Sequence, residues 1–209
     1  MRSVLLEPHY LPSIEYFTIL SQADRLIWDV DSRFQKQTYR NRTYLLSANG
    51  VLPLIVPVSY HQDTKFKDVR IDYSQDWIRQ HRGAFYSAYG KSPFFEYFSD
   101  HIHSCWEAKP KYLVDLNHAF LSVCFRVLQW QIDILIDHSE NAPYDLRDKI
   151  RAKESYECRQ YYEPSLYVQN FGNTFVPNLS ILDLLMCQGP ESGKILRDSI
   201  QTPIERFQG

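Results

Sequence analysis

The chain has 209 residues, of which 44% are apolar and 15% aromatic, and its 23 basic and 25 acidic side chains give a formal net charge of −2. This composition is typical of a globular protein long enough to bury a sizeable core, and it excludes a disordered or low-complexity chain. The small net charge argues against a nucleic-acid-binding protein, which usually needs a basic face. Any anion that binds must therefore meet a local cluster of cations.

Hydropathy and cysteine usage are both typical of a cytoplasmic protein. The apolar run before Glu7 is too short for a signal peptide, and the most apolar later segment, residues 112–136, is interrupted by polar and charged side chains. We therefore expect no membrane span. The cysteines at positions 105, 124, 158 and 187 form no C-x-x-C pair, which indicates reduced thiols and a cytoplasmic location.

The start of the chain predicts a strand, a helix and a second strand. Residues 3–6 and 25–29 are short apolar runs, and residues 13–23 between them have apolar side chains at helical spacing. These elements form a βαβ unit if the two strands are parallel. The β-rich runs that follow flank Asn49-Gly50, which is a strong hairpin signal.

The remainder of the chain is predicted to be mostly helical. Helices are expected within residues 74–90 and 92–108, over the apolar segment 112–136, and from Ser180 onward. Ser180 and Asp183 form an S-x-x-D pattern, a variant of the capping box, so the Ser180 hydroxyl or the Asp183 carboxylate is expected to cap the start of this last helix.

These elements predict a single α/β domain over residues 1–209. Its N-terminal α/β part, about 1–75, has a small, partly parallel sheet that opens with the βαβ unit, plus the β-hairpin. This part is expected to pack against a largely helical second half, about 75–209.

Ionisable side chains follow both predicted strands. Glu7 and His9 come after the first strand, and Asp29 and Asp31 after the second. Ligands of open α/β sheets bind at the edge where the strands end, so these side chains are expected to meet there. We predict His9 as a general base, with Asp29 or Asp31 orienting it or holding a metal.

A basic segment follows, and it supplies the expected anion clamp. Lys36, Arg40 and Arg42 lie in the segment RFQKQTYRNR, residues 33–42, and in an extended segment Arg40 and Arg42 point the same way. These three cations are predicted to bind a phosphate or carboxylate of a small-molecule substrate, and Glu7 and Asp31 are predicted as further substrate-binding residues.

Simpler interpretations of these residues stay open. His9 is also explained as a turn residue bonded to a backbone carbonyl, and the basic group as solvated surface. His81 lies on the apolar face of its predicted helix, which favours a buried structural histidine.

Other motifs indicate neither a metal site nor an identifiable cofactor. HIHSC places only His101 and Cys105 on one helical face, where a zinc site needs three or four ligands. GPESGKI has too few residues between its glycines for a P-loop, and the chain contains no GxGxxG or GxSxG.

Three stretches resemble the WbqC-like protein family. EPHYLPSIEYFTILSQADRLIWDVDSRFQKQTYRNR is similar to the family's opening, WIRQHRGAFYSAYGKSPFFEYF to its middle, and LYVQNFGNTFVPNLSILDLLMCQG to its C-terminal signature. The chain departs from the family at Glu7, where glutamine is usual, and at Ser13, where tryptophan is common. The resemblance adds Tyr10 and Asn41 to the predicted substrate-binding residues.

The resemblance implies a bacterial transferase of surface-polysaccharide (O-antigen) or other glycoconjugate biosynthesis. We expect amino-acyl or acyl transfer to a sugar nucleotide or glycan precursor. A non-catalytic binding or assembly protein, with its tyrosines as the recognition surface, is the alternative. A nucleotidylyltransferase-like enzyme ranks lower, because E-P-H-Y lacks the second histidine and the glycine of that class's motif.

Overall fold

The N-terminal segment forms the βαβ unit that the sequence predicts. In the computed structural model, which describes residues 1–136 and 142–207, strands β1 (Ser3–Leu6) and β2 (Arg25–Trp28) are parallel neighbours. Helix α1 (Ile14–Leu20) connects them, and all of its residues are buried. The register pairs the last residues of the two strands, so both strands end at the same edge of the sheet.

The parallel sheet is completed by strands from the second half of the chain. Strand β7 (Asp133–Leu135) pairs with β2, and β8 (Tyr144–Asp145) pairs with β1, giving the order β7-β2-β1-β8. The prediction of one helix over residues 112–136 is therefore wrong at its end. Helix α4 (Leu113–Leu128) stops at Gln129, whose φ of 56° is left-handed, and the isoleucine-containing segment that follows becomes β7.

The predicted hairpin forms a separate sheet. Strands β3 (Arg42–Ser47) and β4 (Gly50–Ile55) are antiparallel and are joined by Ala48-Asn49. Gly50 has a φ of +99°, a conformation that a residue without a Cβ adopts at no steric cost. A third, shorter sheet pairs β5 (Val58–Ser59) with β6 (Arg70–Ile71).

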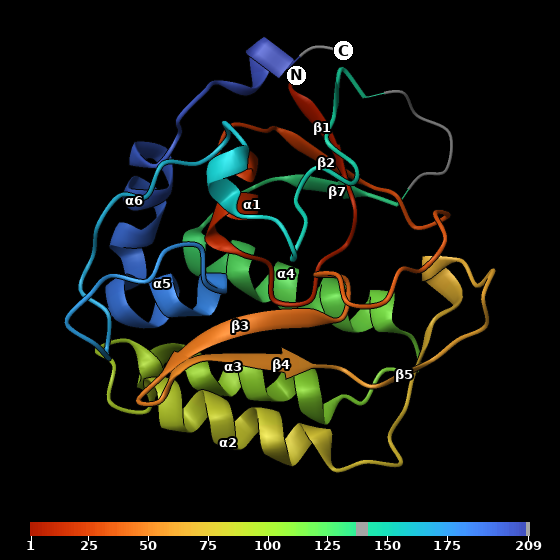
Figure 1. Ribbon diagram of the computed structural model, residues 1–209, viewed down its shortest axis with the longest axis horizontal. Helices are drawn as coiled ribbons and strands as arrows, with labels where there is room; N and C mark the ends of the chain where they lie inside the picture. The colour runs from red at the N-terminus through yellow and green to blue at the C-terminus, as the bar shows by residue number, and fades with distance from the viewer. Residues whose placement is uncertain (137–141, 208–209) are drawn as a thin grey trace.

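The helices are arranged around these sheets (Figure 1). The parallel sheet lies at one end of the molecule and α2 and α3 at the other, with α4 and the hairpin between them and α5 and α6 along one side. The remaining α-helices are α2 (Trp77–Tyr89), α3 (Phe95–Glu107), α5 (Ile181–Gln188) and α6 (Ser192–Asp198). Short 3-10 helices are η1 (Phe66–Asp68), η2 (Tyr156–Cys158), η3 (Gly189–Glu191) and η4 (Ile204–Phe207).

Two expectations about buried polar residues are confirmed. His81 is buried, and its Nδ1 lies 2.9 Å from the Tyr10 hydroxyl. Burial lowers the pKa of His81 to about 4. Ser180 caps α5, because its hydroxyl oxygen accepts a hydrogen bond from the Leu182 backbone N–H at 3.4 Å. Asp183 is buried instead beside Tyr167, whose hydroxyl donates to it at 2.6 Å.

Candidate functional site

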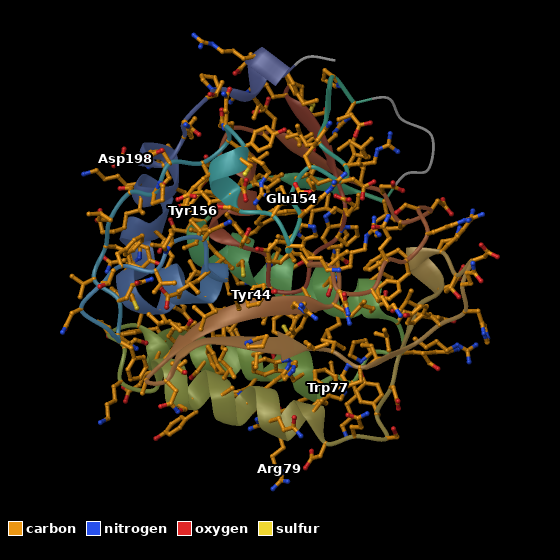
Figure 2. All side chains as sticks on the ribbon, viewed as in Figure 1. Tyr44, Trp77, Arg79, Glu154, Tyr156 and Asp198 are labelled. Carbon is orange, nitrogen blue, oxygen red and sulfur yellow. The ribbon has the colours of Figure 1, made fainter. Side chains whose placement is uncertain are left out.

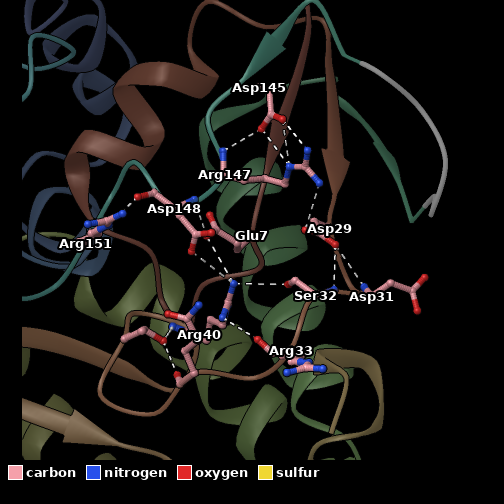
Figure 3. A network of polar contacts seen from close by, with 12 residues as sticks. Glu7, Asp29, Asp31, Ser32, Arg33, Arg40, Asp145, Arg147, Asp148 and Arg151 are labelled. Atoms are coloured by element: carbon pink, nitrogen blue, oxygen red, sulfur yellow. Dashed lines mark hydrogen bonds and ion pairs between the residues drawn. The ribbon is translucent and has the colours of Figure 1, made fainter. Parts of the chain in front are cut away.

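Glu7 directly follows β1 and is the centre of a polar network (Figure 3). Its Oε1 accepts hydrogen bonds from the backbone N–H of Asp148 at 2.6 Å and from Arg40 Nη2 at 3.4 Å. Arg40 is itself buried and donates from Nη1 to the Arg33 carbonyl at 3.0 Å. The guanidinium of Arg40 is therefore occupied in holding Glu7 and the turn after β2.

The sheet topology explains why Glu7 and Asp148 meet. Along the chain, β1, β2 and β7 follow one another in one direction across the sheet, and β8 then returns to the other side of β1. The strand order thus reverses between β1 and β8, and Glu7 and Asp148 follow these two strands. Open α/β sheets bind ligands at such a switch point, outside the carboxyl ends of the strands.

Burial changes the acidity of Glu7. Loss of solvation raises the pKa of Glu7 to about 7, although the positive charge of Arg40 and the N–H of Asp148 oppose this shift. A carboxyl group that titrates near neutrality can both accept and donate a proton under ordinary conditions. Glu7 therefore has the acidity that suits a general acid or base.

His9 is buried between two tyrosine rings. Its ring centroid lies 4.8 Å from that of Tyr16 and 5.4 Å from that of Tyr39, and the side chain is only 2% exposed. Burial lowers the pKa of His9 to about 3, and the positive charges of Arg40 and Arg159 add to this effect. The imidazole is therefore neutral near pH 7 and only weakly basic.

Glu7, His9 and Arg40 line a cleft of about 470 Å³, which we call the Glu7 cleft. Residues of the turn 35–38 form one wall and residues of the segment 148–154 the other. The exposed charged residues on these walls are Lys36, Asp148, Arg151, Lys153 and Glu154, and Arg151 forms an ion pair of 3.0 Å with Glu154.

Backbone conformation and position also mark this cleft. Gln37 on one wall and Asp148 on the other have positive φ values of 63° and 57°. Such conformations in residues other than glycine cluster at functional sites. Figure 2 locates the cleft through its wall residue Glu154, which lies above the hairpin residue Tyr44, toward the parallel sheet, while Trp77 of α2 lies below Tyr44.

The predicted aspartates lie at the same sheet edge but have structural partners. Asp29 Oδ1 accepts the backbone N–H of Ser32 at 3.0 Å, and its Oδ2 lies 3.5 Å from Arg147 Nη1. Asp31 forms ion pairs of 2.8 Å with both Lys65 and Lys67. These contacts stabilise the turn after β2. Neither carboxylate lines the Glu7 cleft.

The other predicted binding residues lie away from the cleft. Tyr10 is fully buried and accepts a hydrogen bond from Trp106 Nε1 at 2.9 Å. Asn41 is buried and donates to the Val56 carbonyl at 2.9 Å.

The expectation of one extended segment through residues 40–42 is wrong. Residues 36–41 form turns and bends, so Arg40 contacts Glu7 while Arg42 Nη1 lies 3.4 Å from the Tyr44 hydroxyl.

The wall at residues 148–154 was not predicted. In the sequence this stretch is charged and resembles solvated surface, and only the pairing of β8 with β1 brings it to Glu7.

A second cluster that the sequence analysis did not predict anchors the chain beyond this wall. Arg159 binds the fully buried Glu15 of α1 through two hydrogen bonds of 2.8 and 2.7 Å, and Asn178 Nδ2 donates to the same carboxylate at 3.1 Å.

The described part of the chain has neither a metal-binding cluster nor a membrane-spanning helix. Within residues 1–136 and 142–207, no group of three or more histidine, cysteine, aspartate or glutamate side chains is placed to hold a metal ion. The helices in these ranges are also too short or too polar to cross a membrane. The predicted two-ligand pair in HIHSC thus gains no third ligand from the described part of the fold.

Comparison with known proteins assigns the family. A model of the WbqC-like protein family matches residues 7–152 and 155–195. The chain belongs to the WbqC-like protein family. The uncharacterized protein Rv1507c of Mycobacterium tuberculosis H37Rv is 24% identical, over 92% of this chain and 96% of that protein. No solved structure matches the chain. The family match includes the residues of the Glu7 cleft, apart from Lys153 and Glu154, and it also includes Arg159.

Proposed function

We propose that this WbqC-like protein is a transferase that binds an anionic small molecule in the Glu7 cleft and uses Glu7 for proton transfer. One observation carries the proposal. A buried carboxyl group with a pKa raised to about 7 lines a cleft at the switch point of a parallel sheet, beneath exposed cations. Perturbed acids in such clefts are typical of catalytic sites.

The proposed reaction is acyl or amino-acyl transfer with Glu7 as the proton-transfer group. As an acceptor hydroxyl or amine attacks the carbonyl carbon of an activated acyl or amino-acyl donor, Glu7 takes the proton that the nucleophile loses. The bond to the leaving group breaks, and the protonated Glu7 returns the proton to it. Lys36 and Lys153 hold the anionic group, while Arg40 positions Glu7.

The biological setting is also part of the proposal. Membership of the WbqC-like family supports a role in surface-polysaccharide or glycoconjugate biosynthesis, with a sugar nucleotide or glycan precursor as the acceptor. Such precursors are made in the cytoplasm, which is where we place the protein. His9, with its lowered pKa, is then a neutral group of the binding site, and Glu7 takes the role of general base that the sequence suggested for His9.

A thermal-shift screen with sugar nucleotides, hexose phosphates and acyl or amino-acyl donors tests the proposal, because a ligand at a hundred times its Kd adds about 2.7 kcal/mol of stability. With a ligand pair in hand, Glu7→Gln should lower turnover by about 10² to 10⁴ and leave binding nearly unchanged. Lys153→Ala should mainly weaken binding, and Lys194→Ala, on the exposed side of α6, is the matched control. Full turnover in Glu7→Gln would contradict the role of Glu7.

The alternative of a binding or assembly protein is favoured by exposed tyrosines. Tyr86 on α2 and Tyr97 on α3 are 66% and 73% exposed. If this alternative holds, no compound in the screen shifts the unfolding temperature, and Glu7→Gln is without effect in cells while Tyr97→Ser abolishes function.

A further inference from the structure

The floor of the Glu7 cleft carries two polar atoms with unused hydrogen-bonding capacity. Glu7 Oε2 and His9 Nδ1 are buried, and neither has a hydrogen-bond partner among the described residues. Both side chains are more than nine-tenths buried, and both residues line the cleft. Buried polar atoms nearly always have partners, because an unpaired one destabilises the fold. A ligand group that enters the floor can supply the hydrogen bonds that the protein does not.

The charges around the floor select the kind of group that fits. The Arg40 guanidinium is paired with the carboxylates of Glu7 and Asp148, at 3.4 and 3.8 Å, so the floor offers no uncompensated charge to an ionic ligand group. A neutral hydroxyl group fits better, because it can donate to His9 Nδ1 or to a Glu7 carboxylate and can accept from a protonated Glu7. Both floor atoms are shielded from water, so contact requires a small opening of the floor.

The mouth of the cleft is suited to an anion. Lys36 and Lys153 lie on opposite walls, and both are exposed and make no ion pair with the described residues. The side-chain amides of Gln35 and Gln37, beside Lys36, are also exposed. These groups can bind a negative charge and the hydroxyl groups next to it.

We propose that the Glu7 cleft selects hydroxylated anions, with the negative group held between Lys36 and Lys153 and a hydroxyl of the same molecule bound by Glu7 and His9. This inference rests on the proposed function and narrows its substrate to a polyol that carries a phosphate or a carboxylate. The volume of about 470 Å³ suits one six-membered ring with its charged substituent.

Matched ligand pairs test the selection. Glucose 1-phosphate and cyclohexyl phosphate share a ring size and a charged group but differ in their hydroxyls, and glucuronate and cyclohexanecarboxylate form the corresponding carboxylate pair. By titration calorimetry, the hydroxylated member of at least one pair should have a Kd about tenfold lower, or lower still, than the hydroxyl-free member. The hydroxyl-free ligand leaves the buried polar atoms of the floor unpaired. The pair that binds identifies the anion.

Variants of His9 and Lys153 then test which residue causes the preference for the hydroxylated ligand. His9→Phe keeps a ring between Tyr16 and Tyr39 but lacks the nitrogen, so it should lower the preference to about threefold or less without weakening the hydroxyl-free ligand. Lys153→Ala should weaken both members of the pair by the same factor, and Lys194→Ala should change neither.

A measurement on the wild-type protein covers the case in which His9→Phe does not fold. The ¹⁵N signal of His9 Nδ1 should shift with the hydroxylated ligand and stay in place with the hydroxyl-free one. Equal affinity within the pair that binds would overturn the selection of hydroxyls while leaving the anion site of the proposed function intact. Failure of all four compounds to bind would overturn that anion site, and this inference with it.

Discussion

Glu7 and His9 lie two positions apart, and one physical cause shifts their pKa values in opposite directions. Burial disfavours the charged form of any group, so the pKa of the acid rises to about 7 and that of the base falls to about 3. Both side chains are therefore mostly neutral at pH values well between 3 and 7.

The raised pKa of Glu7 predicts a pH-dependent stability. Between its ordinary pKa of 4.5 and its folded value of about 7, the folded protein binds more protons at Glu7 than the unfolded chain. The contribution of Glu7 to stability is therefore full below pH 4.5 and falls as the pH rises to 7. In the wild type, this rise in pH should lower the free energy of unfolding by up to roughly 3 kcal/mol, and Glu7→Gln should abolish that decrease. Urea unfolding at pH 5 and pH 8 checks it, and identical pH profiles for the variant and the wild type would refute the raised pKa.

His9 should act in the opposite direction. Its pKa is about 3 in the folded protein against an ordinary 6.5, so its contribution to stability is full above pH 6.5 and is lost as the pH falls toward 3. His9→Phe should make the protein less sensitive to acid over this range. Thermal unfolding between pH 7 and pH 4 measures the change. His81→Phe is a useful comparison, because burial also lowers the pKa of His81, to about 4.

At the scale of elements, the buried pair Glu15–Arg159 ties η2 and the chain around it to α1. Arg159 Nη1 also donates to the carbonyl of Glu154 at 3.2 Å, at the end of the cleft wall. Glu15→Gln or Arg159→Met should each cost about 3–5 kcal/mol, because each leaves the other charge buried and uncompensated.

The double variant supplies the contrast. With both charges removed, much of the lost stability should return, so the two effects should be far from additive in a double-mutant cycle. Arg79→Ala, which breaks the exposed pair with Asp76, should change stability little. Additive losses would show that the two side chains stabilise the fold independently.

The helix start at Ser180 is a second element-scale feature. Its oxygen accepts from the Leu182 N–H, and its hydroxyl donates to the Leu11 carbonyl at 3.1 Å, so it joins α5 to the loop after β1. Ser180→Ala should cost about 1 kcal/mol of unfolding free energy. Ligand binding and turnover should stay nearly unchanged, because Ser180 is not part of the Glu7 cleft. A loss of turnover at unchanged stability would instead assign Ser180 to the chemistry.

At the scale of the whole molecule, the central sheet combines both halves of the chain. β7 and β8 flank β2 and β1, so neither half contains the complete sheet. We expect residues 1–209 to unfold in one cooperative transition, with coincident curves from tryptophan fluorescence and far-ultraviolet circular dichroism. The tryptophans at positions 28, 77, 106 and 130 sample both parts of the fold. Separate transitions would contradict the single-domain prediction.

The sequence by itself determined the features that depend on local pattern. Short apolar runs, helical spacing and Asn49-Gly50 were sufficient for the βαβ unit, the hairpin and the burial of His81, because each depends on neighbours along the chain. The same patterns led to Glu7, His9, Lys36 and Arg40 at the edge of the sheet. Only the tertiary structure decided how these residues are used. The pairing of β8 with β1 brings Asp148 to Glu7 from 141 positions away, and the turn at residues 36–41 separates Arg40 from Arg42. The acidity of Glu7 depends on its burial, which arises from the packing of distant segments and leaves no mark in the residues beside it.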